Sequence, residues 1–562
     1  MEIKRLLMAL VLSFVFIITW NVFFPPPLVN NADYEDQKDV KSALENKKDK
    51  LSPNQKIKNK LSFSDKISKS IETSLLNLDL VNGASSIASC KVVESENGSL
   101  KHVGAWGDNG EIYYDDVPVE LMRSARCNPC IKINGEYVSF DNFNYTQSEK
   151  GSHTILSYSE SGLNKETVIF EDSYVVDHHF NNIPKNAEVS IVWDAGILPS
   201  ERMLSDDISY FSVFAQDQDS YSEEFLSSVE VGSSLVFDDR VGWAGIKSKY
   251  FMNAITNQKF DERKADKVVF RAVEKNINDL KFTNAEVEFF YRYDDLVFNE
   301  SGQKVLSLSS YMGPIDTDLL ENNSKTQHLV QLFGFGWFFI GYLGKGIMWL
   351  LTSLHKIVPN YGIICIMFAF LIRLLTGPLT KKSFLSNQKM QAVQPKMKKI
   401  QDKYKDNPTQ LNQEIMSLYK KEGVNPLGGC LPILVQMPLL IALFQVFRKT
   451  IEFRGAPFLP FWITDLSQPD VILNVPFLSN IWGLSYFFGH GIALLPILMG
   501  VVMFMNMKMT ATSNMNPQAT STMYIMNGFF VLLFNTFPSG LNLYYTVYNI
   551  LNFIQQRKLQ KV

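Results

Sequence analysis

Hydrophobic positions divide the chain into two unlike halves. From about residue 80 to residue 328, short runs of β-branched and aromatic residues alternate with turn residues, whereas the chain after about residue 329 consists of long apolar stretches joined by short polar loops. Short runs at this spacing indicate the strands of a β-sandwich, and long apolar stretches indicate helices that cross a membrane. We therefore predict a polytopic α-helical membrane protein that carries an all-β sandwich domain.

The runs in the first half have the length of single strands. The clearest are His153–Tyr158, Glu166–Phe170, Glu188–Trp193, Val268–Val273 and Glu286–Tyr293. The region has no phosphate-binding loop, nucleophile elbow or metal-ligand spacing. His178 and His179 are neighbours that would point to opposite faces of a strand, so we expect surface histidines and not a shared metal site.

Cys127 and Cys130 form a C-N-P-C motif in the same domain. Export permits a disulfide, and C-x-x-C spacing can be redox-active. The motif has no thioredoxin-like strand–helix context around it. We therefore favour a small structural disulfide, or two plain thiols, over redox catalysis.

The N-terminus has the pattern of a membrane anchor. Lys4 and Arg5 precede an apolar run from Leu6 to Phe24, which ends in three prolines and not in small residues that a signal peptidase would cleave. We predict an uncleaved transmembrane signal anchor over residues 1–27, with its N-terminus in the cytoplasm. Residues 28–79, in which charged and polar residues dominate, then form a flexible tether. The sandwich over residues 80–328 therefore lies outside the cytoplasm.

The apolar stretches after residue 329 predict one interfacial helix and five spans. Several glycines and Lys345 interrupt the first stretch, so we expect residues 329–360 to contain an amphipathic helix lying at the membrane surface. Residues 361–562 then form a core of five transmembrane helices. These spans begin near Tyr361, Leu427, Ile492, Met523 and Leu541. Basic residues after the last span place the C-terminus in the cytoplasm as well.

A strongly basic segment, residues 381–424, separates the first two core spans. It contains ten Lys and four acidic residues, a net charge of +6. A short loop of this charge marks the cytoplasmic side, and its pattern predicts two helices, one ending near Tyr404 and one over Thr409–Glu422. The charge can act as a topology signal alone, or also as a docking surface for an acidic or nucleic-acid partner.

Arg373 lies inside the first core span. An arginine at mid-bilayer depth costs about 2.5–3.5 kcal/mol on insertion-based scales and usually faces a bundle interior or a wet cavity. No Asp or Glu occurs between Asn322 and Gln401 or after Asp470, so no apolar segment offers it a carboxylate partner. The function should therefore explain an unneutralised positive charge in or near the membrane.

Polar residues in other spans suggest what surrounds Arg373. The last span carries four of them on one helical face, and the second core span adds Gln436. The four are Asn542, Tyr545, Asn549 and Asn552. Interhelical hydrogen bonding would explain such residues, but together with Arg373 they favour a hydrated groove.

Several motifs resemble, in matching order, those of the YidC membrane protein insertases. They are YMGP (Tyr311–Pro314), R-x-x-x-x-P-L-T (Arg373–Thr380), NPLGGCLPILVQMPLLIALF (Asn425–Phe444), LPILMG (Leu495–Gly500) and FPSGLNLYY (Phe537–Tyr545). The resemblance covers the chain from about Leu332 onward, while the exported domain matches more by position and strand-like character. One departure is an insertion near residues 471–491, so the family's role for that loop is not carried over.

The resemblance implies a five-helix core with a hydrophilic groove that opens to the cytoplasm and to lipid and is closed outside. Arg373 would give the groove its positive charge, and Gln436, Tyr544 and Tyr545 match other groove positions of the family. The basic hairpin over residues 381–424 would receive substrates from ribosomes and targeting factors. By analogy, the protein would lie in a cell inner membrane with residues of about 25–340 in the periplasm.

The expected function is insertion and folding of integral membrane proteins, alone or with the Sec translocon. A charged, wet groove would attract the acidic tail of a nascent membrane protein, and hydrophobic burial would then drive its apolar segment into the lipid bilayer. Such a mechanism needs no nucleotide, metal or other cofactor, so we do not expect an enzyme. The alternative is a secondary transporter that uses Arg373 to bind an anionic solute, although intramembrane carboxylates and inverted repeats are missing from the sequence.

Overall fold

The computed structural model describes two compact units, one ending at Phe333 and the other beginning at Gly334. It describes residues 67–560 except 82–85, 97, 107–111, 141, 148–150, 218–219, 258–263, 278–279, 299–301, 336–338, 405–406, 425–430, 476–486, 488–490 and 511–516. The predicted signal anchor and most of the predicted tether lie outside the described residues. We call the two units the β-rich unit and the helical unit.

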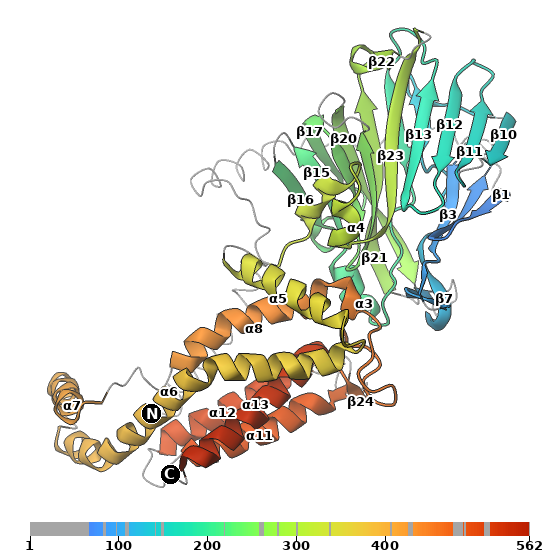
Figure 1. Cartoon of the computed structure of the whole chain (residues 1–562). Coiled ribbons are helices and arrows are strands. Elements are labelled where there is room, and N and C mark those ends of the chain that lie inside the picture. Colours follow the sequence, from blue (N-terminus) through green and yellow to red (C-terminus); the bar gives the residue numbers. More distant parts are fainter. Residues whose placement is uncertain are drawn as a thin grey trace. The chain divides into compact units, whose positions relative to one another are not determined.

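The β-rich unit contains three large antiparallel sheets (Figure 1). The first has the order β10 (Asn142–Gln147), β11 (His153–Tyr158), β12 (Asn164–Ile169), β13 (Val175–Asn181), β23 (Lys304–Pro314), β19 (Phe251–Asn257), β18 (Trp243–Lys247), β15 (Ser212–Asp217) and β16 (Ser220–Phe225), with β22 (Val297–Phe298) beside β23. The second has the order β17 (Ser234–Val241), β20 (Ala265–Ile277), β21 (Leu280–Tyr291), β14 (Val189–Trp193), β8 (Cys130–Ile133) and β9 (Glu136–Tyr137). The third has the order β1 (Ile67–Glu72), β2 (Leu76–Val81), β3 (Ser86–Val92), β7 (Ile112–Met122) and β6 (Val103–Trp106).

Short elements complete the β-rich unit. They are the hairpin of β4 (Ser95–Glu96) and β5 (Ser99–Leu100), the helices α3 (Leu204–Ser209) and α4 (Thr317–Glu321), and single 3₁₀ turns at Leu226–Ser228, Tyr293–Asp295 and Gln327–Leu332. The domain is therefore dominated by strands but is not purely β.

The core of this unit lies between its sheets. β14 and β19 are buried along their whole length, and β11 alternates between buried and partly exposed positions, as a half-buried strand should. The Tyr291 hydroxyl on β21 donates to the Asn257 side chain on β19 at 2.9 Å, which joins the first two sheets across the core. The five strands that the sequence predicts most clearly are confirmed, with ends that shift by a few residues.

The prediction of surface histidines is wrong for His178. Its side chain on β13 is buried, and its Nε2 atom lies 2.9 Å from the Ser310 hydroxyl. Lys165 on β12 is buried nearby and donates to the Pro129 carbonyl at 2.8 Å. Burial lowers the pKa of Lys165 to about 7, and burial together with the Lys165 and His179 charges lowers the pKa of His178 further below its usual range. An alternating pattern cannot reveal such a site, because the sheet is covered on both faces here.

A disulfide joins Cys127 to Cys130 inside the β-rich unit. Both sulfur-bearing side chains are buried against Val192 and pack with Tyr137. The Asp194 carboxylate accepts a hydrogen bond from the Cys127 N–H at 3.0 Å, and burial raises the pKa of this carboxyl to about 6. The buried position agrees with the predicted structural disulfide.

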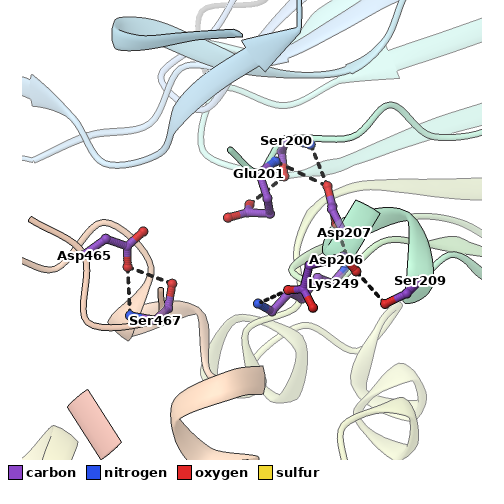
Figure 2. A network of polar contacts seen from close by, with 8 residues as sticks. All are labelled: Ser200, Glu201, Asp206, Asp207, Ser209, Lys249, Asp465 and Ser467. Atoms are coloured by element: carbon purple, nitrogen blue, oxygen red, sulfur yellow. Dashed lines mark hydrogen bonds and ion pairs between the residues drawn. The ribbon is translucent and has the colours of Figure 1, made fainter. Parts of the chain in front are cut away.

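A buried polar network links the chain before α3 to the turn between β18 and β19. The Asp207 carboxylate on α3 accepts hydrogen bonds from the N–H groups of Ser200 at 2.8 Å and Lys249 at 3.2 Å. The Lys249 ammonium pairs with Asp206 at 3.0 Å, as Figure 2 shows. Burial and then the charge of Glu201 raise the pKa of Asp207 to about 7. This carboxyl group therefore titrates close to neutral pH.

The helical unit contains seven described helices. They are α5 (Phe339–His355), α6 (Tyr361–Lys403), α7 (Pro408–Glu422), α8 (Leu431–Lys449), α11 (Leu494–Thr510), α12 (Pro517–Phe534) and α13 (Ser539–Gln560). α13 packs against α6 and α11, α12 packs against α11, and α8 packs against α5 (Figure 1). The loop between α8 and α11 contains a 3₁₀ turn, Ile451–Phe453, and a short hairpin of β24 (Val471–Leu473) and β25 (Ile492–Ala493).

α5 is amphipathic, as the sequence predicts. Ile340, Gly344, Ile347 and Leu351 form its buried face at helical spacing, while Trp349 is largely exposed. Gly344 is necessary at its position because a Cβ atom there would collide with the Phe335 side chain. Its placement at a membrane surface stays a prediction.

α6 is longer than expected because the first core span and the first hairpin helix form one continuous helix. The Asn360 side chain caps its first turn by accepting from the Ile363 N–H at 3.0 Å. Pro378 and Pro395 lie inside the helix without ending it. α7 follows as predicted, with Pro408 at its start and Gly423 in the left-handed conformation at its end.

Among the described helices, α6 alone is both long enough and apolar enough to cross a membrane. Shorter apolar helices cover Leu494–Met509 and Met523–Phe534. The five transmembrane helices of the core stay a prediction.

Candidate functional site

Arg373 faces the interior of the helical unit. Arg373 is only 7% exposed, whereas the next two residues on α6, Leu374 and Leu375, are 76% and 67% exposed. Phe368 and Ala369, about one turn earlier, are buried like Arg373. α6 therefore presents an apolar outer face and turns its one buried cation toward the neighbouring helices.

The partners of Arg373 are neutral. One terminal nitrogen donates to the Thr380 hydroxyl at 3.3 Å and to the Tyr548 hydroxyl at 3.4 Å, and the other donates to the side-chain oxygen of Gln555. The guanidinium carbon lies 5.4 Å from the centroid of the Tyr548 ring, within cation–π range. Among the described residues, the buried Nε atom has no hydrogen-bond partner. Within the described part of the chain, no carboxylate forms an ion pair with this arginine.

Such an arrangement holds a positive charge without cancelling it. A buried charge is costly unless it is paired or hydrogen-bonded, and hydroxyl, amide and aromatic partners reduce that cost while leaving the net charge in place. The free Nε–H adds a donor that a polar group entering from outside could use. The site is thus suited to attract an anionic group.

The two predicted tyrosines lie next to the Arg373 partners on α13. The Tyr544 ring stacks on the Tyr548 ring with centroids 6.0 Å apart, and it contacts Phe368 of α6 at 5.5 Å. The Tyr545 ring points instead toward Phe534 of α12, with centroids 5.5 Å apart, and its buried hydroxyl has no partner. Tyr544 therefore belongs to the Arg373 side of α13, and Tyr545 lies on the adjacent side, with its ring 4.9 Å from the Tyr544 ring between centroids.

The predicted asparagines do not contact Arg373. The Asn542 amide donates to the carbonyls of Phe534 and Phe537, each at 3.1 Å, and so ties the start of α13 to the end of α12. The Asn549 amide donates to the Tyr545 carbonyl of its own helix at 2.8 Å. The Asn542 contacts are the interhelical hydrogen bonding that the sequence left as the alternative to a wet groove, whereas the Asn549 contact lies within α13.

Gln436 lies apart from this cluster. It is half-buried on α8, and its side chain makes no hydrogen bond to another described residue. Asn552 accepts a hydrogen bond from Gln556 one turn later on α13, at 3.3 Å. Of the predicted residues, Arg373 and Tyr544 thus both contact Tyr548. Asn542, Tyr545 and Asn549 contact other described residues.

Thr380, Tyr548 and Gln555 are the site residues that the sequence analysis missed. A signal for two of them exists, because Tyr544, Tyr548 and Gln555 share one helical face at spacings of four and seven residues. The asparagine stripe lies on the adjacent face of the same helix. Thr380 lies seven residues, or about two turns, after Arg373 on the same face of α6.

The loop between α8 and α11 covers one end of the helical unit. Backbone carbonyls of Gln468 and Leu466 accept from the first N–H groups of α13, Ser539 at 2.7 Å and Gly540 at 3.0 Å. The Asp470 carboxylate accepts from the Leu495 N–H at the start of α11 at 2.8 Å. These contacts satisfy amide groups that a helix leaves unpaired at its N-terminus.

The same loop also reaches the start of α6. The Asn360 side chain donates to the Phe458 carbonyl at 3.2 Å, and a Cβ atom on Gly362 would collide with the Phe458 ring. Asp465 stabilises the loop itself, accepting from the Ser467 N–H at 2.8 Å and from its hydroxyl at 2.7 Å (Figure 2). The starts of α6, α11 and α13 are therefore all fastened to the same stretch of this loop, residues 458–470.

Two family models match the chain, and together they cover most of it. The model for the 60Kd inner membrane protein matches residues 353–562, and the model for the YidC periplasmic domain matches residues 141–350.

Curated relatives give the same result. The chain is 32% identical to the membrane protein insertase YidC of Chloroherpeton thalassium over 83% of its own length and 75% of that protein. It is 35% identical to the membrane protein insertase YidC of Prosthecochloris aestuarii over 72% of its own length and 66% of that protein.

A solved structure is also similar. The crystal structure of an active YidC insertase with its first transmembrane domain resolved aligns with 88% of this chain and 92% of that chain, at 17% identity and a TM-score of 0.37. The assignment rests on the sequence matches, which span both units. Members of this family are inner membrane insertases with a periplasmic domain. The chain belongs to the YidC membrane protein insertase family.

Proposed function

We propose that this protein inserts nascent integral membrane proteins into the inner membrane and assists their folding. The observation that carries the proposal is Arg373, a buried cation with neutral partners and a free Nε–H. Its charge attracts the polar or acidic tail of a client toward the interior of the helical unit. The client's apolar segment then moves sideways into lipid. This step is favourable because burying apolar surface away from water contributes about 25 cal/mol per Å².

A groove used in this way must be closed on the outer side, or ions would leak through it. The loop between α8 and α11 supports such a closure, since it fastens the starts of α6 and α11 and of α13 through Asn360, Asp470 and Gln468. The exposed leucines Leu374 and Leu375 lie on the outer face of α6, where lipid would surround them. We place the groove on the Arg373 side of α13, with Tyr544 and Tyr548 in its wall.

The proposed topology follows from the charges around the helices. The basic hairpin formed by the end of α6 and by α7 lies in the cytoplasm, as do both chain termini, and residues of about 25–340 lie in the periplasm. Residues 1–27 form the membrane anchor, residues 28–79 the tether, residues 80–328 the sandwich and residues 329–360 the interfacial segment. Residues 361–562 contribute five transmembrane helices.

Partners follow from the same arrangement. The Lys396 ammonium pairs with Glu422 at 2.7 Å and so joins the two hairpin helices. The remaining lysines of residues 381–424 leave the hairpin with an excess of positive charge. We propose that this surface receives ribosomes and targeting factors, and that the Sec translocon joins for larger clients. The retained alternative is a secondary transporter in which Arg373 binds an anionic solute.

Reconstitution into liposomes tests the proposal. The client is a single-span protein with a short acidic tail, and the readout is protection of that tail from external protease. We expect protected client with the purified protein and none in empty liposomes. Accumulation of an anionic solute without any client insertion would instead establish the transporter.

A further inference from the structure

The described residues of the loop between α8 and α11 include large apolar side chains that are exposed. Phe461 is 85% exposed at the tip of a tight turn, which the Leu459–Ile463 bridge closes. Ile472 and Leu473 on β24 are 54% and 55% exposed. Ile472 lies at an irregularity in the β24–β25 pairing, between Val471 and Leu473, where one strand has an extra residue. The short β24–β25 hairpin therefore carries two neighbouring exposed apolar side chains.

Buried polar groups fix this hairpin in place. The Asn535 side chain at the end of α12 accepts from the Ala493 N–H at 2.9 Å and donates to the Gly491 carbonyl at 2.7 Å. The Asp470 carbonyl accepts from the Leu494 N–H at 3.3 Å, next to the start of β24. The exposed apolar residues of β24 therefore belong to a hairpin that hydrogen bonds hold against the ends of α12 and α11.

We propose that Phe461, Ile472 and Leu473 dock into the outer-leaflet interface of the lipid bilayer, so that this loop anchors the outer end of the helical unit. The proposal rests on the membrane placement of α8 and α11 given above. It goes beyond the insertase function, because it assigns a lipid-binding surface to the loop between α8 and α11.

Continuity with α11 favours lipid as the occupant. β25 ends at Ala493 and α11 begins at Leu494, while Leu473 of β24 pairs with Ile492. Because a helix rises about 1.5 Å per residue, a bilayer that surrounds the first turns of α11 must come within a few ångströms of the hairpin. The apolar surface of α11 and the exposed residues of β24 thus continue into one another.

Charge also favours lipid over water or a soluble partner. The sequence contains no Asp, Glu, Lys or Arg between Asp470 and Lys508. Exposed edge strands in water usually carry charged residues that prevent aggregation, and this edge carries none. A soluble partner would bring a polar rim, for which residues 471–493 offer no Asp, Glu, Lys or Arg as a counterpart.

Depth measurement by spin labelling tests the proposal on the full-length protein in liposomes. Cysteine is introduced at Ile472 or Leu473 in a Cys430→Ser background, because the described free cysteines Cys90 and Cys365 are buried. Val501→Cys on the exposed side of α11 reports on the membrane, and Ser227→Cys on the exposed surface of the β-rich unit reports on water. Collisions with oxygen, which concentrates in lipid, are compared with collisions with a water-soluble nickel chelate.

We expect the labels at residues 472 and 473 to favour oxygen over nickel, between the values at residues 501 and 227. Nickel accessibility equal to that at residue 227, with residue 501 still in lipid, would overturn the lipid docking while leaving the membrane placement intact. Loss of the lipid signal at residue 501 would overturn the membrane placement and the docking together. Spin–spin broadening that disappears on dilution with unlabelled protein would assign the surface to a second copy and would also overturn the proposal.

Discussion

The guanidinium of Arg373 lies over the ring of Tyr548, with 5.4 Å between its central carbon and the ring centroid. The tyrosine hydroxyl also accepts a hydrogen bond from the same side chain at 3.4 Å. One residue of α13 therefore offers Arg373 both a π face and an acceptor, and neither removes the positive charge. This contact joins α6 to α13 and keeps the cation available.

Substitution of Tyr548 separates the two interactions. Tyr548→Phe keeps the ring and loses the hydroxyl, whereas Tyr548→Leu loses both. A cation–π contact contributes about 0.5–2 kcal/mol depending on desolvation, so we expect Leu to destabilise the helical unit more than Phe. Thermal unfolding in detergent measures the difference. Equal stability of the two variants would show that the ring face contributes nothing.

Gly362 tests how the outer loop is fastened to α6. A Cβ atom at this position would collide with the Phe458 ring, so Gly362→Ala should destabilise the protein by about 1–3 kcal/mol through overpacking. Gly346→Ala on α5 is the matched control, because no atom lies within 4 Å of its added Cβ. Chemical unfolding in detergent compares the two variants. A neutral Gly362→Ala would contradict the close approach of the loop.

Lys165 should make stability depend on pH above neutrality. Its pKa is lowered from 10.5 to about 7 in the folded protein, so the unfolded chain binds more protons between these values. Stability therefore rises as the pH increases from about 7 to 10.5. Lys165→Met removes the titrating group, and the stability difference between variant and wild type should shrink over that range. A difference that is constant with pH would disprove the buried neutral lysine.

Asp207 should have the opposite effect at lower pH. Its pKa is raised from 3.8 to about 7, first by burial and then by Glu201, so the folded protein binds the additional proton between these values. Its contribution is complete below about pH 4 and is lost as the pH rises through 7. Asp207→Asn should flatten this decline. Unfolding by denaturant at a series of pH values provides the test, and an unchanged decline would assign it to another group.

The sequence predicted element type more reliably than side-chain contacts. The five clearest strands and the break between α6 and α7 are present, because period-two alternation and helix-ending residues are local signals. His178 was misplaced because its burial depends on β23, a strand far away in sequence that provides Ser310. Local pattern carries no information about such a partner.

The candidate site shows the same limit. Arg373 could be singled out by its position in an apolar run, and its missing carboxylate partner is visible in the sequence. Which face of α13 meets Arg373 depends on helix packing, and the structure selects Tyr548 and Gln555 in place of the asparagine stripe. The asparagine stripe therefore lies on the helix that contacts Arg373, but on the face next to the one that makes the contact, and its place in a groove stays a prediction.

The most direct test of the central claim is insertion of a single-span client by variants of Arg373. The assay compares an acidic outer tail with a neutral tail of equal length, and protein levels are matched. Arg373→Ala should weaken insertion of the acidic-tailed client and affect the neutral-tailed client less, while Arg373→Lys should retain most of the activity because it keeps the charge. Full insertion of the acidic-tailed client by Arg373→Ala at normal protein levels would contradict the attraction of client tails by this buried cation.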